Sequence, residues 1–187
     1  MLRDEGYDVV GQAGDGEEAV RLAEELGYVA FALDYIGDGQ RLADLQQTMA
    51  RLGPLMADPL KTRRIGQAGL DVLMAQDRVD TNRLAAIGYC FGGTMSLELA
   101  RGGADIRAAV GFHSGLATVA PDDAKHIRAR VLVCIGADDP AISAEERAAF
   151  EQEMRAGGVS WQMHVYGGVV HSFTNENAAA LGRPEFA

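Results

Sequence analysis

A chain of 187 residues, 48% hydrophobic and 24% charged, is long enough to bury a sizeable core, and we expect residues 1–187 to form a single domain. The formal net charge of −10, without clusters of Lys and Arg, excludes a typical nucleic-acid-binding surface. No apolar run approaches the ~20 residues of a membrane span, no signal-peptide pattern is present, and two cysteines are too few for a disulfide framework, so we expect a cytoplasmic protein that does not bind membranes.

Short apolar runs alternate with longer helical patterns along the chain. Strands are expected at residues 7–10, 28–33, 84–87, 108–112, 131–135 and 161–166. Helices are expected at residues 15–26, 42–52, 65–76, 91–101 and 143–155, with Gly53-Pro54 interrupting the second. This order predicts the α/β class, with a doubly wound, mainly parallel sheet of about six strands. An open edge of that sheet would favour pairing with a second copy in a homodimer.

A Gly-x-Cys-x-Gly turn follows the third expected strand. Gly88 and Gly92 lie two residues before and two residues after Cys90, and small residues there let a strand turn sharply into a helix. Such a turn lifts the Cys90 side chain clear of the sheet, and the helix N-terminus favours a thiolate and an oxyanion beside it. Cys90 is therefore the candidate nucleophile. The alternative is that Cys90 is a small buried hydrophobe on a glycine-rich turn.

A cysteine nucleophile needs an imidazole to accept its proton and an acid to orient that imidazole. His171, after the last expected strand, is the candidate base, and His113, after the fourth, is a rival base or a wall of the pocket. Asp139 is the candidate acid because Pro140 restricts it to an extended or turn conformation; adjacent Asp138 is the alternative. Each of these residues follows a strand, so the carboxyl edge of a parallel sheet would bring them together.

Four segments carry a family resemblance. They are Leu-Gly-Tyr-Val-Ala-Phe-Ala-Leu-Asp at 26–34, Gly-Tyr-Cys-Phe-Gly-Gly at 88–93, Gly-Ala-Asp-Asp-Pro at 136–140 and Tyr-Gly-Gly-Val-Val-His-Ser-Phe at 166–173. In this order they resemble the dienelactone hydrolase family of α/β-hydrolases, over roughly residue 17 to the end. The resemblance implies an α/β-hydrolase fold, here shortened at both ends.

The resemblance also implies an activity and the residues that perform it. The expected reaction is hydrolysis of a small ester or lactone, of the carboxymethylenebutenolidase type, through an acyl-thioester and without a cofactor or metal. In that reaction Cys90 would be the nucleophile, His171 the base and Asp139 the orienting acid. The remaining candidates are Phe91, Gln12 and Ala13 for the oxyanion hole, and His113, Tyr89 and Phe173 for substrate binding.

The N-terminal part departs from the family pattern. Gln12 stands where the family commonly has a Glu near the thiol, and losing an oxyanion donor can cost ~10²–10³ in rate. The alternative function is therefore a catalytically impaired or non-catalytic domain of signalling origin. The first ~20 residues also resemble part of a response-regulator receiver domain, in which Asp34 would accept a phosphoryl group. No acidic strand that could bind magnesium precedes these residues. We therefore favour the interpretation that they form a β-α-β unit belonging to the hydrolase sheet.

Overall fold

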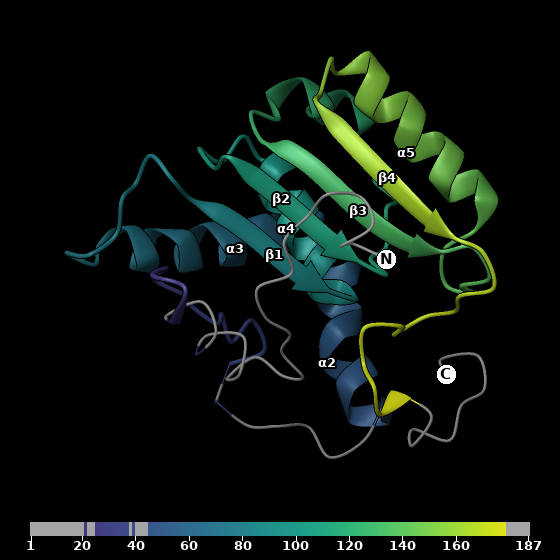
Figure 1. Ribbon diagram of the computed structural model, residues 1–187, viewed down its shortest axis with the longest axis horizontal. Coiled ribbons are helices and arrows are strands. Elements are labelled where there is room, and N and C mark those ends of the chain that lie inside the picture. The colour runs from purple at the N-terminus through teal and green to yellow at the C-terminus, as the bar shows by residue number, and fades with distance from the viewer. Residues whose placement is uncertain (1–20, 22–24, 38, 40–44, 179–187) are drawn as a thin grey trace.

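The computed structural model describes residues 21, 25–37, 39 and 45–178, and a four-stranded parallel sheet lies at its centre (Figure 1). The strands are β1 (Ala85–Tyr89), β2 (Ala108–Phe112), β3 (Arg130–Gly136) and β4 (Trp161–Tyr166), which lie side by side in chain order. The register aligns the strand ends, since Tyr89 lies opposite Phe112 and Phe112 opposite Cys134. The loops that follow the strands therefore leave from one edge of the sheet.

Two helices precede β1 in the chain, and the others lie between the strands. They are α2 (Leu45–Met56), α3 (Pro59–Met74), α4 (Phe91–Arg101), the 3-10 helix η2 (Pro121–His126) and α5 (Ala144–Ala156). The α/β class with a parallel sheet is thus confirmed. No helix in the described part of the chain is long and apolar enough to cross a membrane.

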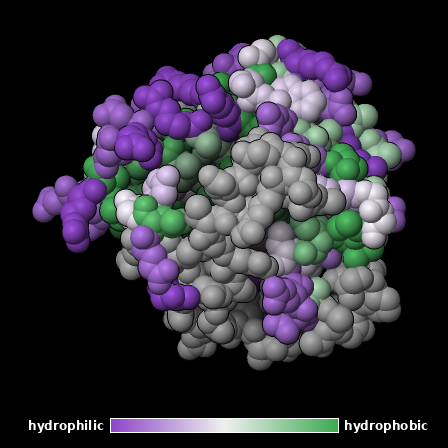
Figure 2. Space-filling view, viewed as in Figure 1, coloured by the Kyte–Doolittle hydropathy of each residue, from purple (hydrophilic) through white to green (hydrophobic). Residues whose placement is uncertain are grey.

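The main core lies on one face of the sheet. Val131, Val133 and Ile135 alternate along β3 and are buried against Leu97 of α4 and Phe150 of α5. Figure 1 shows α3 and α4 behind the sheet, and α3 packs along α4. The helices that pack on the sheet in the described residues therefore cover one face. In the view of Figure 1, hydrophilic residues gather at the upper left, over the ends at which the strands begin (Figure 2).

Two of the six expected strands are not among the four strands of the described residues. Residues 7–10 lie outside the described residues, whereas residues 28–33 are described and form no strand. Leu33 packs instead through its side chain, which closely approaches Gly69 of α3. The other large apolar side chains of this run are not covered, since Tyr28, Val29 and Phe31 are 62%, 46% and 45% exposed. A strand also needs a neighbouring backbone to pair with its N–H and C=O groups, which the composition of the run does not reveal.

The expected break at Gly53-Pro54 was wrong. Both residues lie inside α2, and the next helix begins at Pro59 rather than near residue 65. The Asp58 side chain accepts a hydrogen bond from the Lys61 backbone N–H at 2.9 Å, and Pro59 occupies the first turn, where the lack of an N–H costs nothing. A proline near the end of a helix such as α2 removes one hydrogen bond without ending it.

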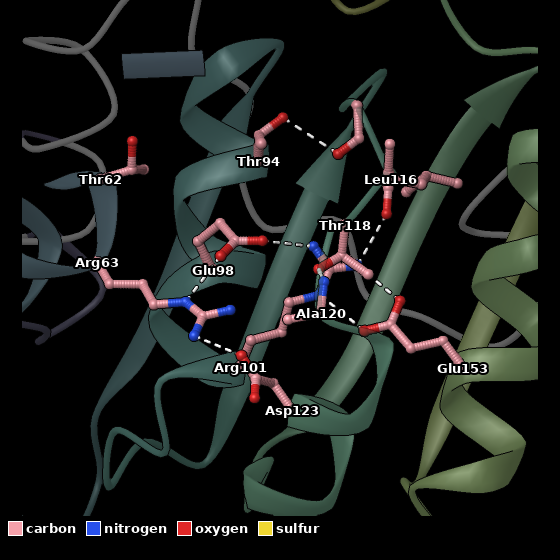
Figure 3. A network of polar contacts seen from close by, with 12 residues as sticks. Thr62, Arg63, Thr94, Glu98, Arg101, Leu116, Thr118, Ala120, Asp123 and Glu153 are labelled. Atoms are coloured by element: carbon pink, nitrogen blue, oxygen red, sulfur yellow. Dashed lines mark hydrogen bonds and ion pairs between the residues drawn. The ribbon is translucent and has the colours of Figure 1, made fainter. Parts of the chain in front are cut away.

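A buried ionic network joins the helices on the covered face (Figure 3). Arg101 of α4 has no exposed side-chain surface; it donates to Glu153 of α5 at 2.8 and 2.7 Å and to Glu98 at 2.8 Å. Arg63 of α3 donates to Glu98 at 2.8 Å and to Asp123 of η2 at 2.6 Å. The network fixes α4, which begins directly after the candidate nucleophile Cys90, against three other elements. Helical periodicity did not predict these charges in the core.

Candidate active site

Cys90 lies at the junction of β1 and α4. Its backbone has φ 52° and ψ −124°, a conformation that costs a non-glycine residue on the order of 1–3 kcal/mol. The Cys90 N–H donates to the Phe112 carbonyl of β2 at 2.9 Å, which holds the turn against the neighbouring strand. The Cys90 side chain is exposed, unlike that of Cys134, the other cysteine. The turn therefore presents a thiol to solvent at the carboxyl edge of the sheet.

The close approach at this turn depends on two glycines, one of which the motif did not single out. A Cβ on Gly88 would overlap the Gly92 carbonyl, and a Cβ on Gly93 would overlap the Ser114 hydroxyl. A Cβ on Gly92 would meet no atom within 4 Å. The expectation that Gly88 and Gly92 both permit the sharp turn is thus right for Gly88 and wrong for Gly92. Gly93 is the second position that must lack a side chain, because there α4 touches the loop after β2.

The loops after β3 and β4 pack against each other. The Asp138 N–H donates to the Val169 carbonyl at 3.0 Å, and the Ala137 N–H donates to the Tyr166 carbonyl at 2.9 Å. Gly136 makes this contact possible, because a Cβ there would overlap the Val169 carbonyl. These backbone contacts bring two side chains from separate loops into one site.

The two side chains are those of Asp139 and His171. His171 Nδ1 lies 2.7 Å from Asp139 Oδ2, and His171 Nε2 lies 3.3 Å from Cys90 Sγ. A carboxylate only accepts, so Nδ1–H donates to Asp139 and Nε2 faces the thiol. Asp139 is held in turn, since its Oδ1 accepts from the Ala141 N–H at 2.9 Å, whereas Asp138 is exposed. The thiol can thus pass its proton to the imidazole, and the carboxylate can stabilise the imidazolium that forms.

The environment of His171 acts on its pKa in two directions. Burial lowers the pKa, but the hydrogen bonds with Cys90 and Asp139 and their negative charges outweigh burial and raise it above the ordinary value of 6.5. The protonated imidazole is therefore stabilised next to the sulfur and the carboxylate. This favours transfer of the thiol proton to His171.

His113 lies beside His171 but does not occupy its position. The two rings are 4.7 Å apart, edge to face, and Phe173 lies 5.4 Å from His113 on another side. His113 Nε2 is 3.0 Å from the Thr174 hydroxyl, while Nδ1 is buried without a hydrogen-bond partner. Burial, aided by the charge of His171, lowers the pKa of His113 to about 4. A neutral imidazole at this place is suited to be a wall of the site.

The other expected site residues are distributed around this centre. Phe91 is the first residue of α4, and its backbone N–H has no acceptor within the helix, as an oxyanion donor requires. Tyr89 stacks on Phe112 at 5.1 Å and lies 6.2 Å from His113. Gln12 and Ala13, expected on the opposite side of the oxyanion hole, lie outside the described residues.

Two residues at the site were not expected from the sequence. Tyr35 packs on the Phe91 ring at 5.5 Å, and its pKa is raised by burial and by the charge of Cys90. Thr174 contacts His113. The sequence indicated them only by position, since Tyr35 lies two residues after the apolar run at 28–33 and Thr174 directly follows Phe173.

Asp34, considered above as a phosphoryl acceptor, holds its own loop. One carboxylate oxygen accepts from the backbone N–H groups of Ile36 and Gly37 at 3.1 and 3.0 Å, and the other from Gly39 at 2.8 Å. The bonds from Gly39, Gly37 and Ile36 lower the pKa of Asp34. Both oxygens are engaged in shaping the turn, which accounts for an acid at this position.

A family model for the dienelactone hydrolase family matches residues 8–184 of the chain. The chain belongs to this family. Membership supports a hydrolase that acts on small substrates, and it confirms the resemblance seen in the four sequence segments. Protein usf of Aquifex pyrophilus is 31% identical over 162 residues, which span 83% of this chain and 67% of that protein.

Two solved structures are similar to the whole fold. One, named m3DLH, is 44% identical with a TM-score of 0.85, covering 94% of this chain and 74% of its own. The other, P91, titled a dienelactone hydrolase-like promiscuous phosphotriesterase from metagenomic libraries, is 38% identical with a TM-score of 0.84, covering 98% of this chain and 81% of its own. A short segment also has a different relative, since 24 residues, or 13% of the chain, are 75% identical to transcriptional regulatory protein PdtaR of Mycobacterium tuberculosis.

Proposed function

We propose that this protein hydrolyses a small ester or lactone, with Cys90 as the nucleophile, His171 as the base and Asp139 as the residue that orients His171. The observation that carries the proposal is the continuous chain of contacts from an exposed thiol to a buried carboxylate, 3.3 Å from Sγ to Nε2 and 2.7 Å from Nδ1 to Oδ2. Family membership supports the reaction class.

The first half of the reaction forms an acyl-thioester. His171 Nε2 takes the proton of Cys90, and the thiolate attacks the carbonyl carbon as the carbonyl π electrons move onto oxygen. The Phe91 N–H supplies one donor to this oxyanion, and the dipole of α4 adds to its stabilisation. When the tetrahedral intermediate collapses, the C–O bond breaks and the leaving oxygen takes the proton from His171. For a lactone the leaving hydroxyl remains attached to the acyl group.

The second half returns the enzyme to its starting state. His171 removes a proton from a water molecule, which attacks the thioester carbonyl, and the C–S bond breaks as the tetrahedral intermediate collapses. The sulfur recovers its proton from His171. The acid product has gained the oxygen of the water molecule, so the hydrolysis as written needs no oxidant, metal or cofactor.

Hydrolysis of p-nitrophenyl acetate tests this function. We expect turnover by the wild type, loss of turnover in Cys90→Ala, and turnover close to wild type in Cys134→Ala, which removes the other, buried thiol. Circular dichroism of each variant shows whether it is folded. If the wild type and Cys90→Ala are equally inert while folded, the proposal fails and the non-catalytic alternative stands.

One relative points to a second substrate class for the same thiol. Because P91 carries the name of a promiscuous phosphotriesterase, a phosphotriester with a p-nitrophenyl leaving group is the second substrate to assay. Release of p-nitrophenol that depends on Cys90 would extend the proposal to phosphoryl centres.

A further inference from the structure

The sulfur and the two imidazoles at the site lie close enough together to be candidate ligands of one metal ion. Cys90, His113 and His171 each offer one ligand atom, and these atoms lie within 4.8 Å of one another. Among the described residues, this is the group of three such ligands that could surround a metal ion. We infer that the cluster binds a single Zn²⁺ ion reversibly, and that the bound ion blocks the nucleophile. The inference concerns an inhibitory ion and not a resident cofactor.

The Cys90–His171 pair already has the separation of two zinc ligands. Zn–S and Zn–N bonds of about 2.3 and 2.0–2.1 Å place tetrahedral S and N ligands about 3.5 Å apart. The observed distance from Sγ to Nε2 is 3.3 Å. A Zn²⁺ ion could therefore replace the proton between these atoms with little movement of either side chain.

Asp139 completes the zinc-binding arrangement behind His171. A histidine that binds zinc through one nitrogen usually donates its other N–H to a carboxylate, which fixes the ring and makes it a stronger ligand. His171 Nδ1 is 2.7 Å from Asp139 Oδ2, and the Asp139 side chain has no exposed surface. The same contact that would orient His171 for catalysis thus prepares it to bind a metal.

His113 supplies the third ligand. Its side chain is buried, with only 4% of the residue exposed, and of its two ring nitrogens one contacts Thr174 while the other has no partner. The His113 ring thus has one nitrogen, Nδ1, that forms no hydrogen bond in the fold. Three protein ligands leave the fourth tetrahedral position to water, and because Cys90 is exposed, the ion can enter from solvent.

The exchange is balanced without any redox step. One proton leaves the Cys90–His171 pair for solvent, and Zn–S and Zn–N bonds form to the thiolate and the neutral imidazole. The sulfur lone pair that would attack a carbonyl is then engaged in the Zn–S bond. Inhibition should be relieved when a chelator removes the ion.

Metal binding is measured directly, without substrate, so that its outcome is separate from that of the proposed hydrolysis. Chelator-treated protein is titrated with Zn²⁺ in equilibrium dialysis, and with Co²⁺ while the thiolate-to-cobalt absorption is recorded. We expect one equivalent to bind to the wild type, and the absorption to vanish in Cys90→Ala. Asp139→Asn should weaken binding about 10–100-fold, the usual loss when a partner of a metal ligand is removed, and His113→Gln, which removes a ligand itself, should weaken it at least as much.

His126→Ala is the matched control, because His126 is an exposed histidine on η2 and lies outside the cluster. Its affinity for Zn²⁺ should equal that of the wild type. The inference is overturned if the wild type binds no stoichiometric ion, or if a folded His113→Gln binds as tightly as the wild type. It is also overturned if His126→Ala loses the ion, which would place the metal on the surface. Cys90→Ala keeps the test decisive should His113→Gln not fold, since retained Co²⁺ absorption would contradict a thiolate ligand.

Discussion

His171 Nδ1 lies 2.7 Å from Asp139 Oδ2, although 32 residues separate them in the chain. The contact exists because the loops after β3 and β4 are hydrogen-bonded to each other through their backbones. Asp139→Asn preserves the size of the side chain but lets the amide donate to Nδ1, which would leave Nε2 protonated and unable to accept the thiol proton. We expect kcat on p-nitrophenyl acetate to fall on the order of 10²–10⁴-fold.

Asp138→Asn is the control for this prediction, since Asp138 is adjacent in sequence but exposed. Its kcat should stay near the wild-type value. Equal losses in both variants would show that charge in this loop matters generally, and no loss in Asp139→Asn would contradict an orienting role.

Alanine substitutions of two glycines around Cys90 should have opposite outcomes. Gly88→Ala forces a Cβ into the Gly92 carbonyl, and overpacking of this kind costs about 1–3 kcal/mol or more in free energy of unfolding. Gly92→Ala introduces a Cβ that meets nothing within 4 Å and removes a glycine from a helix, so stability should be unchanged or slightly raised. Urea unfolding of both variants measures this, and equal destabilisation would contradict the packing described for the turn.

The buried ionic network should be sensitive to the loss of one partner. Arg101→Met leaves Glu98 and Glu153, whose side chains are 4% and 2% exposed, without their shared cation, and we expect a loss of about 3–5 kcal/mol. Adding Glu153→Met should restore part of that loss, because the variant removes the stranded charge. Arg155→Met, at an exposed pair with Glu151, should cost less than ~1 kcal/mol. Urea unfolding at pH 7 compares the variants, and a double variant no more stable than Arg101→Met would contradict the assignment.

His113 should make the protein less stable as the pH falls. Its pKa is about 4 in the folded protein against 6.5 in an unfolded chain, so between these values the unfolded state binds a proton that the folded state does not. The stabilising effect of the neutral ring is complete above pH 6.5 and is lost progressively down to pH 4, by up to about 3 kcal/mol. His171, whose pKa is raised, contributes with the opposite sign.

Comparison with His113→Gln isolates this contribution, because His171 is present in both proteins. The difference in free energy of unfolding between wild type and variant should shift against the wild type as the pH falls from 7 to 4. A difference that is constant over this range would contradict a buried neutral His113.

The parts of the fold predicted correctly from sequence depended on local patterns. The strand at 108–112 and the helix that Ser143 caps match β2 and α5, and the Ser143 hydroxyl accepts the Glu146 N–H at 3.1 Å as a capping box requires. Residues 28–33 were mispredicted because strand formation depends on a partner distant in sequence. That residues 1–187 form one domain stays a prediction.

The part of the candidate site that could be predicted is the part whose residues lie beyond the ends of strands. Cys90, Asp139 and His171 each follow a strand, and parallel strands bring such residues to one edge, where the structure has them within hydrogen-bonding distance. Their roles in catalysis stay predictions. Gly93 and Arg101 were missed because their importance comes from tertiary contacts, with the Ser114 hydroxyl and the Glu153 carboxylate, that no periodicity reports.

The central claim is that Cys90 carries the acyl group, and mass spectrometry of a quenched reaction tests it most directly. The wild type is mixed with p-nitrophenyl acetate, stopped in acid during turnover and digested, and the acetylated peptide is identified. The account predicts acetyl on the peptide that contains Cys90, decaying once substrate is exhausted and absent from Cys90→Ala. Turnover without acetyl on Cys90, or acetyl on a different residue that decays at the rate of turnover, would contradict it.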